Sequence, residues 1–555
     1  MTTRANTRWG TLVLILAMGL SLTAQTPAPA ARPTPAPKRA TPALVVMIVI
    51  DQFRGDYVQL YGKQWTKGLH RIFTNGAYFP LGAYPYSGTV TCAGHTTIGT
   101  GAYPRTHGMI GNSWFDRESK KSVACTADAA VNSVPFGGLP GVEHHGPKWL
   151  QTTTFADELR NQSAIPPHIA SFSLKARSSI GMVGHAGDLV VWEEDNGKWA
   201  TSSAFANSAR PDIDAYAKAH AVYAQYGRVW DRFMPPSSYL FSDEGVGEVK
   251  NDGGAITFPH PQVRPEGKPD QTFVLNWERS PFADEALADM AITFSDNFGK
   301  TAGTDMLAVS FSALDFVGHR YGPKSHEVQD ILARLDAQLG KIFDTLDRRL
   351  GAGNYVVALS ADHGIAQIPE QVTALGLDAG RLTAASVNTR IIDAWKPFAT
   401  DAASPIASGN GSDIYFTPAA LAVLRSTPTA RQAVTDAALA TPGIAKAYWG
   451  DDLALANAGD DAIRHAAILS YSPGRSADLQ LILKQNWMAA STGTTHGTPY
   501  GYDQRVPVAM MGFGIRPGQY LTSASPADLA PTLALLTGII LPRAEGRPLT
   551  EAVVR

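Results

Sequence analysis

The sequence predicts an α/β fold in which a central, mostly parallel β-sheet is sandwiched by helices. Several short apolar runs rich in β-branched residues, such as LVVMIVI at residues 44–50, are typical of strands buried on both faces of a parallel sheet. A long amphipathic pattern separates two of these runs, as in a βαβ unit. With 555 residues, of which 44% are hydrophobic, the chain is long enough to bury a deep core.

Four apolar runs are the predicted strands: residues 44–50, 306–311, 355–359 and 508–511. Between the second and third runs, the apolar residues from Val328 to Leu346 recur with a period close to 3.6, which predicts a helix over 326–350. Strand, helix and strand at this spacing form a βαβ unit. A second helix is predicted over 526–536, with Gly538 as its stop signal.

The N-terminal segment has the pattern of an export signal. Arg4 and Arg8 precede an apolar run at 11–22 that is short for a bilayer span, and Ala24 closes a plausible cleavage site. We interpret residues 1–24 as a signal peptide, with an uncleaved N-terminal anchor as the alternative. The Pro/Ala-rich residues 25–43 are typical of an extended linker. We therefore expect a periplasmic or secreted protein, with no stable membrane span after cleavage.

The remaining chain, residues 44–555, is predicted to be one catalytic domain. Two stretches, at about 207–271 and 370–487, break the strand–helix rhythm, and we interpret them as insertions that could cap an active site. The net charge of −2 gives no overall attraction to nucleic acid, and no nucleic-acid-binding module is expected. Nothing in the sequence indicates the oligomeric state. Cys92 and Cys125 are the two cysteines; they could form a disulfide in an oxidising compartment or remain separate thiols.

Aspartate and histidine residues lie near the ends of the predicted strands. In chain order they are Asp51, Asp315, His319, Asp362, His363 and His496. Ligand sites form at the carboxyl ends of parallel strands, so these six side chains could converge. Three clustered carboxylates repel one another unless cations neutralise them, and mixed Asp/His ligation favours zinc over magnesium or calcium. Each short motif alone is more often a turn, but together they predict two zinc ions with three protein ligands each.

Residues 87–112 contain the candidate nucleophile. Thr91 is placed at the start of a helix predicted over about 92–100, where N–H groups and the helix dipole favour an anion. A hydroxyl needs a base or a metal to activate it, and no histidine is obviously placed as a base. We therefore expect Thr91 to coordinate metal, with an ordinary N-cap as the alternative.

The order of these residues resembles the alkaline phosphatase superfamily. The run T-x-x-x-H…G-x-Y-P-x-x-H-G…N, which ends at Asn112, is similar to the branch that holds nucleotide pyrophosphatase/phosphodiesterases and PafA-like phosphatases. The resemblance implies that Asp315, His319 and His496 hold one zinc ion. It implies that Asp51, Asp362 and His363 hold the other, with Thr91 beside it as nucleophile and ligand. A phosphothreonine intermediate would then form during hydrolysis of small phosphate monoesters.

A pair of cations distinguishes monoesterases from diesterases within this superfamily. The segment S-L-K-A-R puts Lys175 and Arg177 two residues apart at the end of a β-like run, which predicts that both face one side. Extra donors favour a phosphate monoester dianion over a singly charged diester, and this S-x-K-x-R is similar to the pair in PafA-like monoesterases. Asn112 would add an amide donor. A diesterase or nucleotide pyrophosphatase is the alternative, and a solvated strand edge is the structural alternative for the two cations.

Two further interpretations compete with the phosphatase hypothesis. A sulfatase would require proline and arginine where Gly94 and Thr96 stand, so this function is excluded. A catalytically silent metal- or phosphate-binding protein has no need of a threonine beside a full ligand set. An assay of metal content together with phosphate ester hydrolysis separates that protein from an enzyme.

Overall fold

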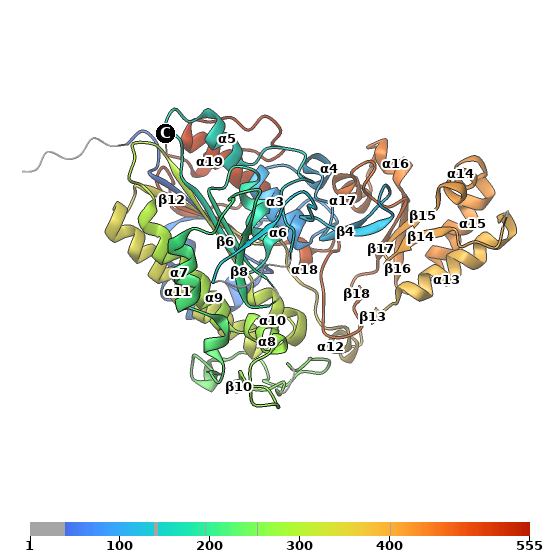
Figure 1. Ribbon diagram of the computed structural model, residues 1–555. Helices are drawn as coiled ribbons and strands as arrows, with labels where there is room; N and C mark the ends of the chain where they lie inside the picture. Colours follow the sequence, from blue (N-terminus) through green and yellow to red (C-terminus); the bar gives the residue numbers. More distant parts are fainter. Residues whose placement is uncertain (1–38, 138–142, 195, 252–253, 400, 555) are drawn as a thin grey trace, which may run out of the picture. The chain divides into compact units, whose positions relative to one another are not determined.

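A large mixed β-sheet is the central layer of the computed structural model (Figure 1). Within the described residues, which are 39–137, 143–194, 196–251, 254–399 and 401–554, ten strands form it in the order β20-β2-β19-β12-β1-β11-β6-β7-β8-β5. Their bounds are β1 Leu44–Ile50, β2 Ala77–Phe79, β5 Ser133–Pro135, β6 Ile169–Ser173, β7 Leu189–Glu194, β8 Lys198–Ser202, β11 Asp305–Phe311, β12 Tyr355–Ser360, β19 Val508–Gly512 and β20 Gly518–Gln519. The consecutive strands β12, β1, β11, β6 and β7 are parallel, so their carboxyl ends share one edge.

All four predicted strands are present, but one of them runs in the opposite direction. The run at 508–511 is β19, which pairs antiparallel with both β12 and β2. Its likeness to a central parallel strand was misleading, because β19 is buried on both faces just as the parallel strands are. Since β19 is antiparallel to β12, it begins at the edge where the parallel strands end.

Helices cover both faces of the sheet, which confirms the predicted α/β sandwich. On β1, Leu44, Val46, Ile48 and Ile50 belong to one hydrophobic cluster, and the alternate residues Val45, Met47 and Val49 belong to another. The first cluster is completed by α2 Gly68–Asn75, α9 Pro281–Phe294, α10 Ala313–Tyr321 and α11 His326–Leu350. The second is completed by α3 Thr91–Thr100, α5 Phe155–Gln162, α6 Ala176–Val183 and α19 Leu529–Thr537. Each β1 side chain is therefore buried in one of two apolar layers.

Both predicted helices are present, and the one with a predicted stop signal ends at it. Helix α11 has the predicted bounds, and its N-cap Ser325 accepts a hydrogen bond from the Val328 N–H. The segment predicted as a helix over 526–536 starts with a 3-10 turn at Pro526–Asp528 and continues as α19. Gly538 ends α19 with a φ of 74°, a left-handed conformation that glycine adopts without steric cost.

The chain between 370 and 487 forms a lobe with a sheet and a core of its own (orange in Figure 1). Its strands, in sheet order, are β14 Ile406–Gly409, β15 Asp413–Phe416, β17 Leu479–Leu483 and β16 Ile444–Trp449. Its hydrophobic cluster draws on α13 Ala384–Trp395, α14 Pro418–Ser426 and α15 Pro428–Leu439. This separate core explains why the stretch breaks the strand–helix rhythm of the main sheet.

Among its described residues, the chain between 207 and 271 forms short elements, which include α7 Pro211–Ala219, β9 Val229–Trp230 and β10 His260–Pro261. It is held to α11 by Asp330, whose carboxylate accepts from the Trp230 Nε1 at 2.8 Å and the Phe233 N–H at 2.6 Å.

The predicted signal peptide at 1–24 and linker residues 25–38 lie outside the described residues. In the part of the chain that the structure describes, every helix is too short or too polar to cross a bilayer.

Candidate active site

The six predicted metal ligands gather at the carboxyl edge of the parallel strands. Asp51 follows β1, and Asp362 with His363 follows β12. Asp315 and His319 lie one turn apart on α10, directly after β11. His496 lies in the loop that leads into β19, and the antiparallel direction of β19 brings this loop to the same edge.

The donor atoms of these residues form two groups that share His363. Those of Asp51, Asp362 and His363 lie within 4.8 Å of one another, as do those of Asp315, His363 and His496. The rings of His363 and His496 stack with centroids 3.4 Å apart. His319 Nε2 lies 3.1 Å from Asp315 Oδ1, so His319 joins the second group through Asp315.

Three of the histidines are oriented by main-chain carbonyl groups. The Nδ1 atoms of His319, His363 and His496 lie 2.8, 2.9 and 2.8 Å from the carbonyl oxygens of Thr494, Gly364 and Thr89. An N–H at Nδ1 that donates to a carbonyl leaves Nε2 with its lone pair, and Nε2 is the atom that faces the carboxylates. Histidine ligands of metal ions are held in this way.

Buried atoms in the first group lack hydrogen-bond partners. Asp51 Oδ1, Asp362 Oδ2 and His363 Nε2 are buried without a partner among the described residues. Burial, together with Asp315 and Asp362, raises the pKa of Asp51 well above its usual range. Unpartnered buried carboxylate oxygens are costly, and a cation between them removes that cost. The donor set therefore fits divalent metal ions, and its mixture of oxygen and nitrogen suits zinc.

Lys175 bridges the two groups of ligands. Its Nζ donates to Asp51 Oδ2 and to Asp315 Oδ2, both at 2.6 Å, and its side chain is only 4% exposed. Although burial raises the pKa of Asp315, Lys175 and His319 lower it, and the net shift is well below the usual range. Lys175 is thus a buried cation at the centre of the site.

The predicted strand geometry of Lys175 and Arg177 was wrong. Strand β6 ends at Ser173, Lys175 is the extended N-cap of α6, and Arg177 lies in the first turn of that helix. Both nevertheless line one cavity of about 310 Å³ together with Asn112, Glu278 and Phe316. The two cations therefore share a cavity at the junction of β6 and α6, and not a face of a strand.

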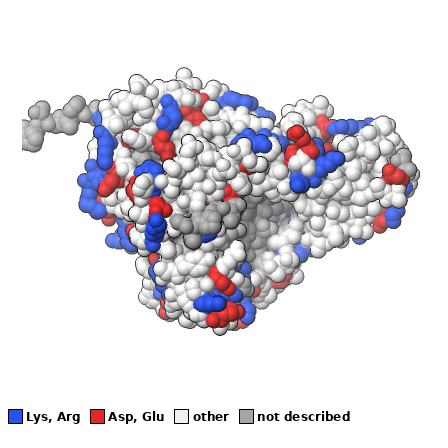
Figure 2. Space-filling model, viewed as in Figure 1, with Lys and Arg blue, Asp and Glu red and all other residues white. Residues whose placement is uncertain are grey.

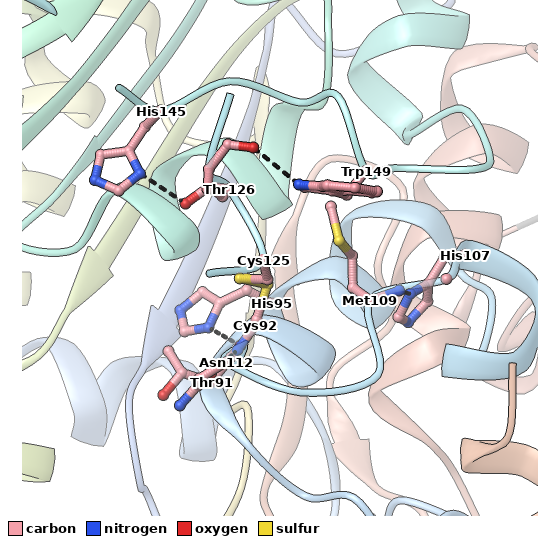
Figure 3. Close-up of a disulfide and its surroundings, with 12 residues drawn as sticks. Thr91, Cys92, His95, His107, Met109, Asn112, Cys125, Thr126, His145 and Trp149 are labelled. Carbon is pink, nitrogen blue, oxygen red and sulfur yellow. Dashed lines mark hydrogen bonds between the residues drawn. A yellow bond between two sulfur atoms is a disulfide. The ribbon is translucent and has the colours of Figure 1, made fainter. Parts of the chain in front are cut away.

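Thr91 is the first residue of α3 and is 1% exposed. The N-cap of α3 is Val90, so the alternative interpretation of Thr91 as an ordinary N-cap was wrong. Cys92 and Cys125 form a disulfide, which settles a question that the sequence left open. Asn112 lies against this disulfide and beside Thr91, where its Oδ1 accepts from the Cys92 N–H at 2.9 Å (Figure 3).

Two buried residues at the site were not predicted. His95, one turn after Thr91, has its Nδ1 2.9 Å from the Thr91 carbonyl oxygen and 3.3 Å from Asp362 Oδ2. Gln52 donates from its main-chain N–H to Asp362 Oδ1 at 3.0 Å and from Nε2 to Asp315 Oδ1 at 2.6 Å. The four-residue spacing from Thr91 could have indicated His95. Nothing indicated Gln52, whose left-handed φ of 70° is a property of the fold.

Charge outside the site is mixed. Figure 2 shows basic and acidic side chains interspersed over the face that it draws, in keeping with the net charge of −2. The chain as a whole therefore gives no strong attraction to anions.

Residues 45–504 match the family described as type I phosphodiesterase / nucleotide pyrophosphatase. The chain belongs to this family. It is 31% identical to alkaline phosphatase PafA of Elizabethkingia meningoseptica, over 93% of this chain and 95% of that protein. It is 29% identical to alkaline phosphatase PhoV of Synechococcus elongatus, over 92% and 93%.

The solved structures agree with the sequence comparisons. The crystal structure of wild-type PafA matches with a TM-score of 0.82 at 30% identity, over 93% of this chain and 99% of that one. The predicted resemblance to PafA-like members and the predicted fold are thus both confirmed. Family membership and near-complete coverage of both chains make this protein a hydrolase of phosphate esters.

Proposed function

We propose that this protein is a zinc-dependent alkaline phosphatase that hydrolyses small phosphate monoesters through a phosphothreonine on Thr91. The observation that carries the proposal is the cavity that gathers Asn112, Lys175 and Arg177 beside the Asp/His groups. A monoester dianion has three terminal oxygens, and three donor side chains match them in number. A solved variant of PafA has one threonine, one asparagine, one lysine and one arginine substituted, the last two being two positions apart, as are Lys175 and Arg177.

The proposed ligand sets assign the shared His363 to the first group of donors and add His319, which lies beside Asp315, to the second. Asp315, His319 and His496 would hold one zinc ion, and Asp51, Asp362 and His363, with Thr91, would hold the other. When bound, two zinc ions supply Lewis-acid stabilisation of the attacking and leaving oxygens.

The side chains of this protein account for the remaining steps. Asn112, Lys175 and Arg177 donate hydrogen bonds to the non-bridging oxygens and orient phosphorus toward Thr91. Thr91 Oγ1 releases its proton to solvent and bonds to phosphorus as the ester P–O bond breaks, and the leaving alcohol takes a proton from solvent. A water then attacks phosphorus, the Thr91 P–O bond breaks, and inorganic phosphate leaves. The first N–H groups of α3 favour negative charge on Thr91, and His95 holds its main-chain carbonyl.

The proposal includes export and a covered site. The signal-like residues 1–24 and the linker at 25–43 would deliver the catalytic domain, residues 44–555, to the periplasm or the exterior. The segments at 207–271 and 370–487 would be insertions that cap the cavity.

The test compares p-nitrophenyl phosphate with bis-p-nitrophenyl phosphate on the purified, metal-loaded protein. We expect a much higher kcat/KM for the monoester, because the diester offers one fewer charged oxygen. Thr91→Ala protein from the same preparation is the control for contaminating phosphatase. A higher kcat/KM for the diester would instead favour the phosphodiesterase activity for which the family is named.

A further inference from the structure

A disulfide closes the base of the segment that carries Asn112 (Figure 3). Asn112 directly precedes β3 Ser113–Asp116, which pairs with β4 Lys121–Ala124 in a two-stranded ribbon. Cys125 directly follows β4, and Cys92 is the second residue of α3. The bond therefore fastens the open end of the ribbon to the first turn of α3, one residue after Thr91.

Both half-cystine residues also hold Asn112 through their main-chain N–H groups. The Cys92 N–H donates to Asn112 Oδ1 at 2.9 Å, and the Cys125 N–H donates to the Asn112 carbonyl oxygen at 3.0 Å. These two bonds occupy the acceptor oxygens of Asn112. They leave the Nδ2 group, with its two N–H donors, for a ligand in the cavity that Asn112, Cys125 and Lys175 line together.

Apart from the disulfide, the base of the ribbon is held mainly by the packing of Trp114. A lone two-stranded ribbon is marginally stable in water, and Trp114 is the single buried residue of β3 and β4. Trp114 packs in a small hydrophobic cluster of which Cys92 and Cys125 are themselves members. Trp114 also packs edge-on against Trp149 and lies under the Arg475 guanidinium. Nearer the tip, Arg117 bonds to Asp478 at 3.0 Å and Phe115 packs on Tyr415. Without the disulfide, the hydrogen bond from the residue-92 N–H to Asn112 Oδ1 and the packing of Trp114 would remain. No covalent link would then fix the distance between Asn112 and Thr91.

We propose that the Cys92–Cys125 disulfide is a positioning element for substrate recognition, which holds the Asn112 amide beside Thr91 at the phosphoryl site. This inference rests on the proposed function, in which Asn112 donates to a phosphoryl oxygen. Both sulfur-bearing residues are 1% exposed, so solvent has little access to the bond in the folded protein. Opening the bond lowers monoester turnover through Asn112, and not through metal binding or global unfolding.

The test is a double-mutant cycle. The Cys92→Ala/Cys125→Ala change is introduced into the wild-type, Asn112→Ala and Lys175→Met proteins, and kcat/KM for p-nitrophenyl phosphate is measured well below the unfolding temperature, with zinc content checked. In the wild-type background we expect a loss of about tenfold, since a misplacement of about 1 Å can cost up to a hundredfold. In the Asn112→Ala background the loss should be below about twofold, because the group that the disulfide positions is already gone. Lys175→Met protein, the matched control, should show the full loss.

Equal fold losses in all three backgrounds, or no loss in the wild type, would overturn the inference and leave the disulfide as a purely stabilising link. The Asn112→Ala single variant tests the proposed function separately: full monoester activity in that variant would remove Asn112 from substrate binding. If the cysteine variants do not fold, a phosphine reductant replaces them, applied to wild-type and Asn112→Ala proteins in sub-denaturing urea that lets the buried bond become transiently accessible. The proteins are then returned to zinc-containing buffer, and thiols are counted by mass spectrometry. The same pattern is then expected, with activity lost in the wild type and little further loss without Asn112.

Discussion

Replacing Lys175 by methionine separates substrate binding from support of the metal ligands. The ammonium group has three N–H donors, and two of them bond to Asp51 and Asp315 at 2.6 Å. The third is available to a phosphoryl oxygen. Methionine keeps the bulk of the buried side chain and removes the charge, so packing changes little.

The magnitude follows from the loss of one charge-assisted hydrogen bond. Such a bond contributes about 1.5–3 kcal/mol, so monoester kcat/KM should fall by roughly tenfold to a hundredfold. Diester kcat/KM should fall by less, because a diester has one fewer charged oxygen. Zinc affinity should not decrease, because removing a cation from beside Asp51 and Asp315 makes these carboxylates more attractive to a metal ion.

The assay pairs both p-nitrophenyl esters with a zinc titration against a competing chelator. Arg177→Ala is the companion variant, since Arg177 lines the same cavity from the first turn of α6. The double variant should move the ratio of activities furthest toward diesters. If monoester and diester rates fall equally, or if zinc affinity falls in parallel with activity, Lys175 holds the ligand carboxylates in place and the specificity argument fails.

Three further outcomes are expected. Thr91→Ala protein should lose most of its activity and form no acid-stable phosphoprotein, yet bind zinc at the wild-type stoichiometry; a phosphorylated variant would contradict the role of Thr91. Cys92→Ala/Cys125→Ala should lower the free energy of unfolding, measured by denaturant titration, by about 3–4 kcal/mol. This value is the loop-closure entropy expected for a disulfide that joins residues 33 positions apart. Burial raises the pKa of Asp284 to about 7, so the folded state favours its protonated form. The resulting contribution to the free energy of unfolding is fully present below the ordinary carboxyl pKa and is lost as pH rises toward 7. In Asp284→Asn protein, the free energy of unfolding measured by urea titration should change less with pH over this range. An unchanged pH dependence would show that Asp284 is ionised throughout.

Features with a local signal in the sequence were predicted well. The bounds of β1 and α11 coincide with an apolar run and with a 3.6-residue pattern, both of which depend on neighbouring residues. Asp315 and His319 meet because a four-residue spacing on a helix brings two side chains together.

Features set by distant parts of the chain could not be predicted. The direction of β19 cannot be read from its apolar sequence, because a strand buried on both faces has the same pattern whether it runs parallel or antiparallel to its neighbours. The disulfide depends on how the ribbon returns to α3, and Gln52 reaches two carboxylates only because its backbone is left-handed. Lys175 was expected on a strand face, but its position depends on where β6 ends and α6 begins.

The place of β19 in the sheet has a consequence for the time at which the site is completed. Strand β19 lies between β12 and β2, so a segment near the C-terminus pairs with two strands that are synthesised much earlier. His496 arrives with the same late segment. A chain still being synthesised can therefore pair β1 with β11 and β12, but it still lacks β19 between β12 and β2, and His496 among the clustered Asp and His residues. Pairing over such sequence distances is slow, so the protein acquires hydrolytic capacity only at the end of folding, after the whole chain has emerged.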